Sequence, residues 1–246
     1  MPNSVTETAA AKINLYLHVL GKRSDGYHEL QSLVAFADIS DEVTAEPAFD
    51  WSLTIDGRFA GRLAEENTNE NLVLRAAHRL LSATGKRAAL RLTKNLPVAS
   101  GIGGGSADAA AALRCLQALY QTGTGAPAAW ADLGADIPVC LLTRPALVEG
   151  MGEQLTALPR MPALPAVLVN PGVPSATGAV FKALAGRYGK GLSPPLPAPA
   201  DLQNVETFAA WLAGSRNDLA APAIETLPEI GEVLTALQTA AGALLV

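Results

Sequence analysis

Cysteine is scarce in this sequence, which argues against a disulfide scaffold or a zinc-binding module. The 246 residues include two cysteines, Cys115 and Cys140, which lie far apart and among apolar neighbours. No Cys/His spacing in the chain is typical of a zinc site. Both residues are therefore predicted to be reduced thiols in the core of a cytosolic protein.

Charge and long apolar runs are also limited. Charged residues make up 17% of the chain and the formal net charge is −5, so no attraction to nucleic acid or anionic membranes is expected. No apolar run reaches the length of a membrane span, and the start at Met1 lacks the basic region and apolar core of a signal peptide. The sequence predicts a cytoplasmic α/β protein with one large or two modest domains.

The most informative feature that is present is a glycine-rich run at residues 97–110. Four of the five positions from Gly101 to Gly105 are glycine, and Ser106 and an alanine-rich helical segment follow directly. Glycine lets the backbone adopt positive φ and approach a ligand closely. The N–H groups and the dipole at the start of the following helix favour an anion, most often phosphate. The alternative is a tight turn in which packing alone starts the helix.

This predicted phosphate loop is of neither common kind. A Walker A loop ends in Gly-Lys-Ser/Thr, and no lysine follows these glycines. A dinucleotide fingerprint would have a third glycine where Ser106 stands, and an acidic residue about 20 positions later. A strand is predicted at residues 90–94, before the loop, and the helix after Ser106 is predicted to end near Gly123. The unit is therefore strand, glycine loop and helix.

Hydrophobic periodicity predicts the other regular elements. The strands are expected at residues 7–19, 30–39, 51–55 and 166–170, and the helices at residues 71–81 and 230–237. A turn after Trp130 is expected to lead into a buried run that reaches Leu141.

Proline-rich stretches suggest how the chain is divided. Prolines punctuate residues 143–165, which predicts a boundary there between two lobes, at residues 1–150 and 151–246. Residues 193–199 are expected to form a loop stiffened toward polyproline. The chain stops on the apolar residues 242–246, and this is expected to be a cut or incomplete C-terminus.

Two polar residues interrupt the first apolar strand. Strand alternation puts Lys12 and Asn14 on the same face. A lysine buried there must become neutral, reach solvent or meet an anion, because an unpaired buried charge is costly. The alternative is an edge strand on which Lys12 is solvated.

Among the carboxylates, Asp136 is the best candidate for a catalytic residue. It follows Gly134-Ala135 at a turn before the buried run, and Pro138 is expected to hold Ile137 in an extended conformation. A carboxylate fixed in this way can orient and deprotonate a hydroxyl group, and a nearby ammonium would keep it ionised. Asp136 could equally cap a turn, and Asp132 competes for the catalytic role.

An Asp-Gly turn at residues 25–26 ends the first predicted hairpin. Tyr27 and His28 follow it, where a loop can present an aromatic ring and a hydrogen-bonding imidazole to a ligand. The alternative is that both residues only fill the surface or the core.

Five segments resemble one protein family in their order and spacing: residues 11–15, 23–30, 71–73, 96–110 and 134–138. The glycine-rich run is similar to that of the GHMP kinase superfamily, the galactose, homoserine, mevalonate and phosphomevalonate kinases. The segment Asp-Gly-Tyr-His-Glu-Leu is more specific, because it resembles the family of that superfamily whose acceptor is 4-diphosphocytidyl-2-C-methyl-D-erythritol. The resemblance extends over almost the whole chain.

The resemblance implies an α+β, two-lobed GHMP kinase fold. Residues 1–150 would form the ATP-binding lobe, similar to ribosomal protein S5, and residues 151–246 a ferredoxin-like lobe, incomplete at its C-terminus. A third glycine-rich segment of the superfamily would follow Val246, so a chain that ends there is expected to be weakly active, inactive or unstable. The implied activity is transfer of the γ-phosphate of ATP to the substrate's 2-hydroxyl in non-mevalonate isoprenoid synthesis.

The resemblance also implies residue roles, cofactors and partners. Asp136 matches the catalytic base, with Lys12 beside it, and ATP and Mg²⁺ would be the cofactors, although no Mg²⁺ ligand is identified beyond a role for the Ser106 region. A substrate with a cytidine diphosphate group would contact Asn14, Tyr27, His28 and Phe181. The ATP-binding residues would be Asn71, Lys94, Pro97, Val98, Ala99, Ser100, Gly101, Ile102, Gly103, Gly104, Gly105, Ser106 and Ala107. A monomer is favoured over a weak homodimer.

Two other functions remain open at this point. The chain could be another GHMP kinase that acts on a small alcohol such as homoserine or mevalonate, against which Tyr27, His28 and Phe181 argue. It could also be a truncated nucleotide-binding module without catalysis. Competition by cytidine nucleotides would distinguish the first alternative from a kinase with a cytidine substrate. An assay of ATP consumption with that substrate would distinguish the second.

Overall fold

The computed structural model of the protein describes residues 2–64, 67–158, 160–188, 197–198, 201–240 and 242–245. The strands are β1 (Val5–Lys22), β2 (His28–Pro47), β3 (Ser52–Asp56), β4 (Ala88–Thr93), β5 (Ala146–Gly150) and β6 (Gln154–Ala157). The helices are α1 (Leu72–Leu81), α2 (Gly104–Tyr120), α3 (Ile137–Leu142), α4 (Thr177–Leu184), α5 (Val205–Leu212), α6 (Ala220–Thr226) and α7 (Glu229–Gln238). Most of the loop predicted at residues 193–199 lies outside the described residues.

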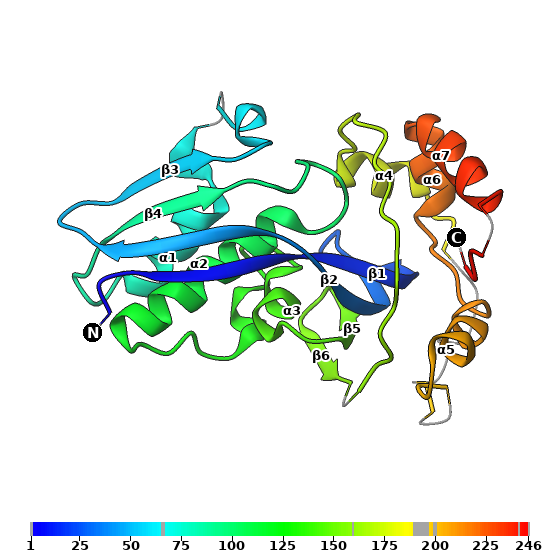
Figure 1. The fold of residues 1–246 in the computed structure, drawn as a ribbon, viewed down its shortest axis with the longest axis horizontal. Helices are drawn as coiled ribbons and strands as arrows, with labels where there is room; N and C mark the ends of the chain where they lie inside the picture. The colour runs from blue at the N-terminus through cyan, green and yellow to red at the C-terminus, as the bar shows by residue number, and fades with distance from the viewer. Residues whose placement is uncertain are drawn as a thin grey trace.

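A long antiparallel hairpin of β1 and β2 forms the centre of the sheet and runs across the molecule (Figure 1). Besides β1, strand β2 pairs with β4 through residues 42–47 and with β5 through residues 30–34. The sheet path is β3-β4-β2-β5-β6, and among the described strands the β3–β4 pair is parallel while the others are antiparallel. The predicted strands at 7–19, 30–39, 51–55 and 90–94 are confirmed, and the hairpin is longer than predicted.

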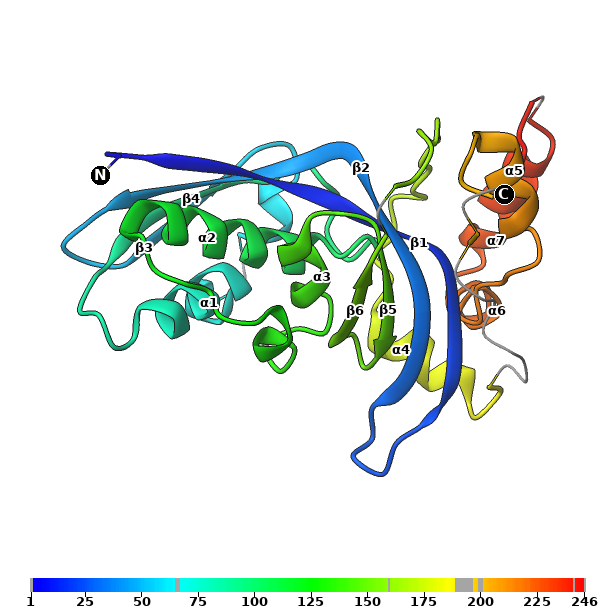
Figure 2. The ribbon, with the colours of Figure 1, turned by 90° about the horizontal axis from the view of Figure 1, so that it is seen from below.

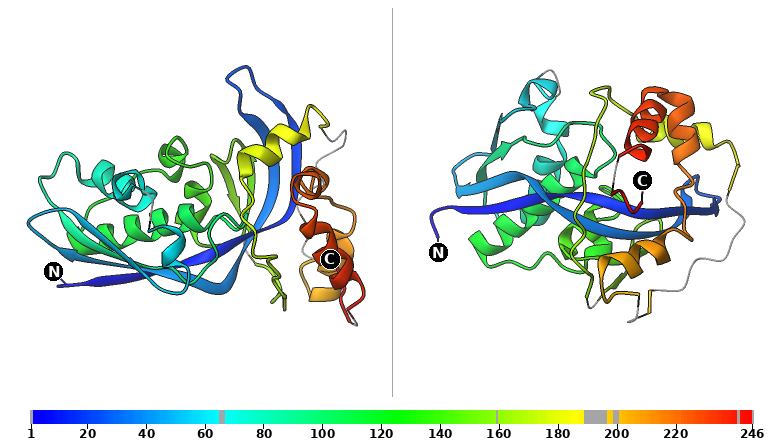
Figure 3. Two further views of the ribbon diagram at one scale, coloured as in Figure 1. Left: turned by 90° about the horizontal axis from the view of Figure 1, so that it is seen from above. Right: turned by 45° about the vertical axis from the view of Figure 1, so that its right-hand side comes forward.

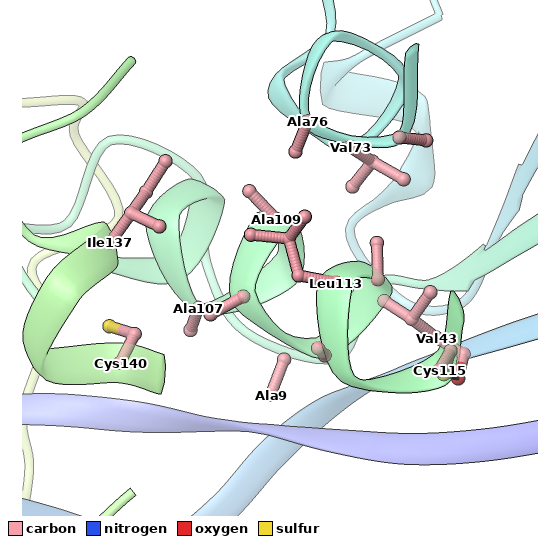
Figure 4. Close-up of a cluster of buried hydrophobic side chains, with 14 of the residues drawn as sticks. Ala9, Val43, Val73, Ala76, Ala107, Ala109, Leu113, Cys115, Ile137 and Cys140 are labelled. Carbon is pink, nitrogen blue, oxygen red and sulfur yellow. Dashed lines mark hydrogen bonds between the residues drawn. The ribbon is translucent and has the colours of Figure 1, made fainter. Parts of the chain in front are cut away.

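Helices α1, α2 and α3 lie against one face of this sheet (Figure 2). The buried face of α2 is made largely of alanine, so the helix can lie close to the strands beneath it and to α1 above it. Figure 4 shows this packing, with α2 between α1 and the sheet, for Ala9, Val43, Val73, Ala76, Ala107, Ala109 and Leu113. Cys115 and Cys140 are free, buried thiols in the same core, as predicted.

Two local predictions around α2 and α3 need correction. Helix α2 begins at Gly104, two residues before the predicted start at Ser106, because Gly103 in the left-handed conformation already turns the chain into the helix. The buried run after Asp136 is the helix α3, and Ile137 is its first residue and is not extended. Pro138 lies in the first helical turn, where the missing N–H costs no hydrogen bond.

The C-terminal part consists mainly of helices. Helices α5, α6 and α7 gather at the end of the molecule away from the N-terminus (Figure 3). The strand predicted at residues 166–170 is not formed, although all five residues are described, because none of the described strands pairs with this segment. The predicted helix at 230–237 is confirmed as α7. None of the described helices is long and apolar enough to cross a membrane.

A short segment before α6 returns to β1. The N–H of Leu17 donates to the carbonyl of Arg216, and the N–H of Asp218 donates to the carbonyl of Leu17, over 3.1 Å and 2.8 Å. The Asp218 carboxylate also accepts the N–H of Val19 over 2.8 Å. These bonds attach the C-terminal helices to the same strand that carries Lys12.

Candidate active site

A cavity of about 840 Å³ opens between the sheet and the C-terminal helices. Its lining comes from β1, the glycine-rich loop, the turns before α3 and after β5, and helices α4, α6 and α7. The predicted residues that line it are Lys12, Asn14, Asn71, Lys94, residues 97–106, Asp136 and Phe181. Residues from distant parts of the sequence are thus brought to one cleft.

The glycine-rich loop forms one wall of this cleft. Gly101 and Gly103 have φ angles of +76° and +67°, which glycine adopts without a steric penalty. Gly103 is the N-cap of α2, and the N–H of Ala107 is the first to bond back to it, over 2.9 Å. The N–H groups at the start of α2 therefore have no partner within the helix and can bind an anion.

Lys12 and Asp136 form the polar centre of the cleft. Lys12 Nζ donates to Asp136 Oδ1 over 2.9 Å and to Asn14 Oδ1 over 3.0 Å. The Lys12 side chain is 6% exposed and that of Asp136 is 39% exposed, so the ammonium is enclosed while the carboxylate faces the cleft. The alternative of a solvated Lys12 is therefore wrong. Asp132 lies elsewhere, in an exposed ion pair with Arg79.

Several interactions fix this pair. The N–H of Lys12 donates to the carbonyl of Ile102 over 2.9 Å, which joins β1 to the glycine-rich loop. Asn14 Nδ2 donates to Ser32 Oγ on β2 over 2.7 Å. Irregularities in the strand register lie on each side of Lys12 and Asn14, between Ala10 and Lys12 and between Asn14 and Tyr16. Such irregularities re-aim side chains locally.

Lys94 has partners that sequence reasoning missed. Its ammonium lies between two buried carboxylates, Asp41 on β2 and Asp108 on α2, and it donates to Asp108 Oδ2 over 2.8 Å. Asp41 Oδ1 also accepts the N–H groups of Asn95 and Leu96, at the entry to the glycine-rich loop. The three charged groups thus connect both ends of this loop. The sequence signal was weak, since Asp108 is a single acidic residue in an alanine-rich helix and Asp41 lies beside Glu42 in a strand with several acidic residues.

The hairpin residues and Phe181 are partly brought together. The His28 ring stacks on Phe181 with 4.8 Å between ring centroids. Burial and the nearby Lys22 lower the pKa of His28, which favours its neutral form. Tyr27 is 56% exposed at the hairpin turn and does not line the cleft, nor does His28.

Asn71 and Ser106 line the cleft at the starts of two different helices, α1 and α2. Asn71 is the N-cap of α1, and its Oδ1 accepts the N–H of Val73 over 2.9 Å, so its side-chain amide remains available. Ser106 lies in the first turn of α2. Ala107, predicted with the loop, is buried in the core and does not line the cleft.

Comparison with known proteins agrees with this arrangement. Residues 71–144 match the GHMP kinases N terminal domain. A 4-diphosphocytidyl-2-C-methyl-D-erythritol kinase of Parvibaculum lavamentivorans is 50% identical, over 100% of this chain and 85% of the relative. That of Ruegeria pomeroyi is 53% identical, over 94% and 81%. The chain belongs to this kinase family.

Solved structures support the same conclusion. A crystal structure of 4-(cytidine 5'-diphospho)-2C-methyl-D-erythritol kinase is 36% identical, with a TM-score of 0.74 over 95% of this chain and 82% of that one. A homoserine kinase from Cytophaga hutchinsonii, with 20% identity and a TM-score of 0.58 over 100% and 81%, shares the fold alone. The kinase therefore has the mixed α+β fold of the GHMP kinases, as predicted.

The donor set for a metal ion in this kinase is sparse. No group of three or more His, Cys, Asp or Glu side chains in the described ranges is arranged to hold a metal. Ser106 and Asp136 both line the cleft and carry oxygen donors. Mg²⁺ usually takes one or two protein oxygens together with substrate phosphates and water, so this sparse set suits it.

The C-terminal wall of the cleft could not be found from the sequence. Asn217, Leu219 and residues of α6 and α7 line the cavity opposite the glycine-rich loop. Apolar periodicity predicted the helix at residues 230–237 but not α6, and it gave no sign of which element either helix would face. The bonds between residues 216–218 and β1 decide that position.

Replacing Asp108 by asparagine will flatten the pH dependence of stability. Burial and the neighbouring Asp41 raise the pKa of Asp108 to about 7, although Lys94 opposes the shift. The folded state thus binds this proton more tightly than the unfolded chain, so the unfolding free energy decreases as pH rises from about 4 to about 7. Asp108→Asn cannot titrate, and should lose less stability over this interval, by up to a few kcal/mol.

Urea unfolding of both proteins at about pH 5 and about pH 8 measures this difference. Every other titrating group is common to the two proteins, so the difference between their slopes reports Asp108 together with its interactions with neighbouring charges. Equal slopes would show that Asp108 stays ionised throughout.

Proposed function

We propose that this kinase transfers the γ-phosphate of ATP to the 2-hydroxyl of 4-diphosphocytidyl-2-C-methyl-D-erythritol, in the non-mevalonate route to isoprenoids. The observation that carries the proposal is the Lys12–Asp136 pair, with 2.9 Å between Nζ and Oδ1, beside a helix start with free N–H groups. Membership of the kinase family supports the choice of substrate.

In the proposed reaction Asp136 acts as the catalytic base. Its carboxylate orients the 2-hydroxyl and accepts its proton, while the hydroxyl oxygen attacks the γ-phosphorus and the bond to the bridging oxygen of ADP breaks. Lys12 holds the Asp136 carboxylate in place through its hydrogen bond and neutralises charge that develops on the transferred group. Phosphoryl transfer requires mainly alignment and charge stabilisation, which an enclosed ammonium beside a partly exposed carboxylate can supply.

ATP is proposed to bind along the glycine-rich loop, with its triphosphate at residues 97–106, which line the cleft, and its adenosine toward Asn71 and Lys94. The free N–H groups at the start of α2 support the triphosphate position. The Lys94 ammonium is already paired with Asp41 and Asp108. We therefore propose that Lys94 helps to shape the adenosine side of the site and makes no ion pair with ATP. When bound, Mg²⁺ would be held by the triphosphate and Ser106 and would offset phosphate charge.

The cytidine end of the substrate is proposed to lie at the β1–β2 hairpin. His28 stacks on Phe181, and a neutral imidazole can both donate to and accept from a cytosine. Tyr27 is exposed on the same turn, where it can close over the base opposite Phe181. Asn14, bonded to Lys12, would contact the methylerythritol part.

The lobe organisation belongs to the same proposal. Residues 1–150 would form an S5-like ATP-binding lobe, and residues 151–246 a ferredoxin-like lobe. The division at residue 150 falls in the turn between β5 and β6, which pair with each other. The kinase is proposed to act as a monomer.

A direct assay tests the function. The purified chain is incubated with ATP, Mg²⁺ and 4-diphosphocytidyl-2-C-methyl-D-erythritol, and ADP release and the phosphorylated product are measured. Homoserine and mevalonate serve as control acceptors, and CDP as a competitor. We expect turnover only with the cytidine substrate and inhibition by CDP. ATP binding without ADP release would support a non-catalytic nucleotide-binding module instead.

A further inference from the structure

The backbone just before Asp136 is in close contact with the turn between β5 and β6. A Cβ atom added at Gly152 would lie 2.3 Å from the carbonyl oxygen of Ala135 and 3.2 Å from its carbonyl carbon. Gly152 is buried, lines the cleft and has a φ angle of +121°, so it meets both the steric and the conformational requirement for glycine. Ala135 immediately precedes Asp136.

Hydrogen bonds hold the turn that carries Gly152 in place. The N–H of Gly152 donates to the carbonyl of Glu149 over 3.2 Å, and the N–H of Met151 donates to Glu153 Oε2 over 2.7 Å. Gly150, at the start of the turn, is the register partner of Leu30 on β2. The turn is therefore fixed to the central hairpin, two residues from His28.

Gly103, in the glycine-rich loop, limits the space beside the Lys12–Asp136 pair. A Cβ at Gly103 would lie 3.1 Å from Lys12 Cε and 3.5 Å from Asp136 Oδ2. The loop side of the Lys12–Asp136 pair therefore has little free space, and the backbone that carries Asp136 is limited separately at Ala135 by Gly152.

We propose that Gly152 is a positioning residue for the phosphoryl transfer: through backbone contact with Ala135 it sets the place of the Asp136 carboxylate relative to Lys12 and the acceptor hydroxyl. This inference rests on the proposed role of Asp136. Gly152 touches no reacting atom in the proposed reaction. Its effect is therefore on the alignment of the base, which phosphoryl transfer depends on.

The substitution Gly152→Ala tests this role. The added methyl group must push the Ala135–Asp136 backbone away, and a displacement of about 1 Å at a reacting group costs about 100-fold in rate. We expect kcat to fall by about tenfold to 100-fold, with the KM for ATP and the affinity for a non-hydrolysable ATP analogue changed less than about threefold.

Gly85→Ala is the matched control. Gly85 also has a positive φ of +69°, but nothing lies within 4 Å of a Cβ added there, in the turn after α1. This variant also places a side chain at positive φ, with less backbone strain than at +121°, and makes no such contact, so it should keep the wild-type kcat. Thermal unfolding of both variants reports the loss of stability separately from the loss of turnover.

The outcomes separate the inference from the function on which it rests. If Asp136→Asn abolishes turnover and a folded Gly152→Ala retains wild-type kcat, the positioning role is wrong and the proposed function stands. If Asp136→Asn retains turnover, the role of the base itself fails. A parallel fall in kcat and ATP affinity in Gly152→Ala would mean general damage to the cleft, and would also overturn the proposal.

Glu153→Ala keeps the test decisive if Gly152→Ala does not fold. It removes the acceptor for the N–H of Met151 and loosens the turn without adding an atom. We expect a smaller fall in kcat, about threefold to tenfold, again with unchanged KM for ATP. Wild-type kcat in Glu153→Ala would then contradict the positioning role of this turn.

Discussion

Asp136→Asn will lower turnover by about 10²- to 10⁴-fold, because the asparagine can still accept the hydrogen bond from Lys12 but cannot take the proton of the acceptor hydroxyl. ATP affinity should change little, since the backbone N–H groups at the start of α2 bind the triphosphate in the proposed arrangement. Steady-state kinetics with the cytidine substrate and a separate titration with a non-hydrolysable ATP analogue measure the two effects independently.

Asp132→Asn provides the control for this substitution. Asp132 lies four residues earlier in the sequence, is exposed and pairs with Arg79, and does not line the cleft. The same chemical change there should leave kcat at the wild-type level. Near-normal turnover in Asp136→Asn, or an equal loss in Asp132→Asn, would remove Asp136 from the role of base.

The sequence was sufficient where the signal is local. Alternation along the first strand put Lys12 and Asn14 on one face, and their side chains are hydrogen-bonded. Apolar spacing identified the hairpin, α1 and α7, and the glycine cluster identified the loop before α2. These features depend on a few neighbouring residues, whose conformational preferences act over one turn or a few strand positions.

Contacts between distant segments were beyond local reasoning. Lys12 and Asp136 are 124 positions apart, and only their resemblance to a family suggested that they meet. Asp41 and Asp108 were missed because an acidic residue, whether next to another one in a strand like Asp41 or alone in an apolar helix like Asp108, gives no sign of a distant partner. Residues 166–170 have the composition of a strand, yet a strand requires a neighbour to complete its hydrogen bonds, which local composition does not reveal.

Replacing Lys94 by methionine will destabilise the kinase by about 3–5 kcal/mol, because it leaves Asp41 and Asp108 buried without their shared cation. Methionine has a similar volume and flexibility, so the loss is of charge more than of packing. The entry to the glycine-rich loop should also loosen, since Asp41 holds the N–H groups of Asn95 and Leu96.

Arg91→Met is the control for the charge in this final experiment. Arg91 lies on the same strand, β4, but its ion pair with Asp56 is exposed, and such pairs contribute about 1 kcal/mol or less. Urea unfolding of the two variants compares a buried cation with an exposed one. Adding Asp108→Asn to Lys94→Met should recover part of the lost stability, because it removes one of the two facing carboxylates. Equal, small losses in both single variants would mean that the buried charges do not hold the loop in place.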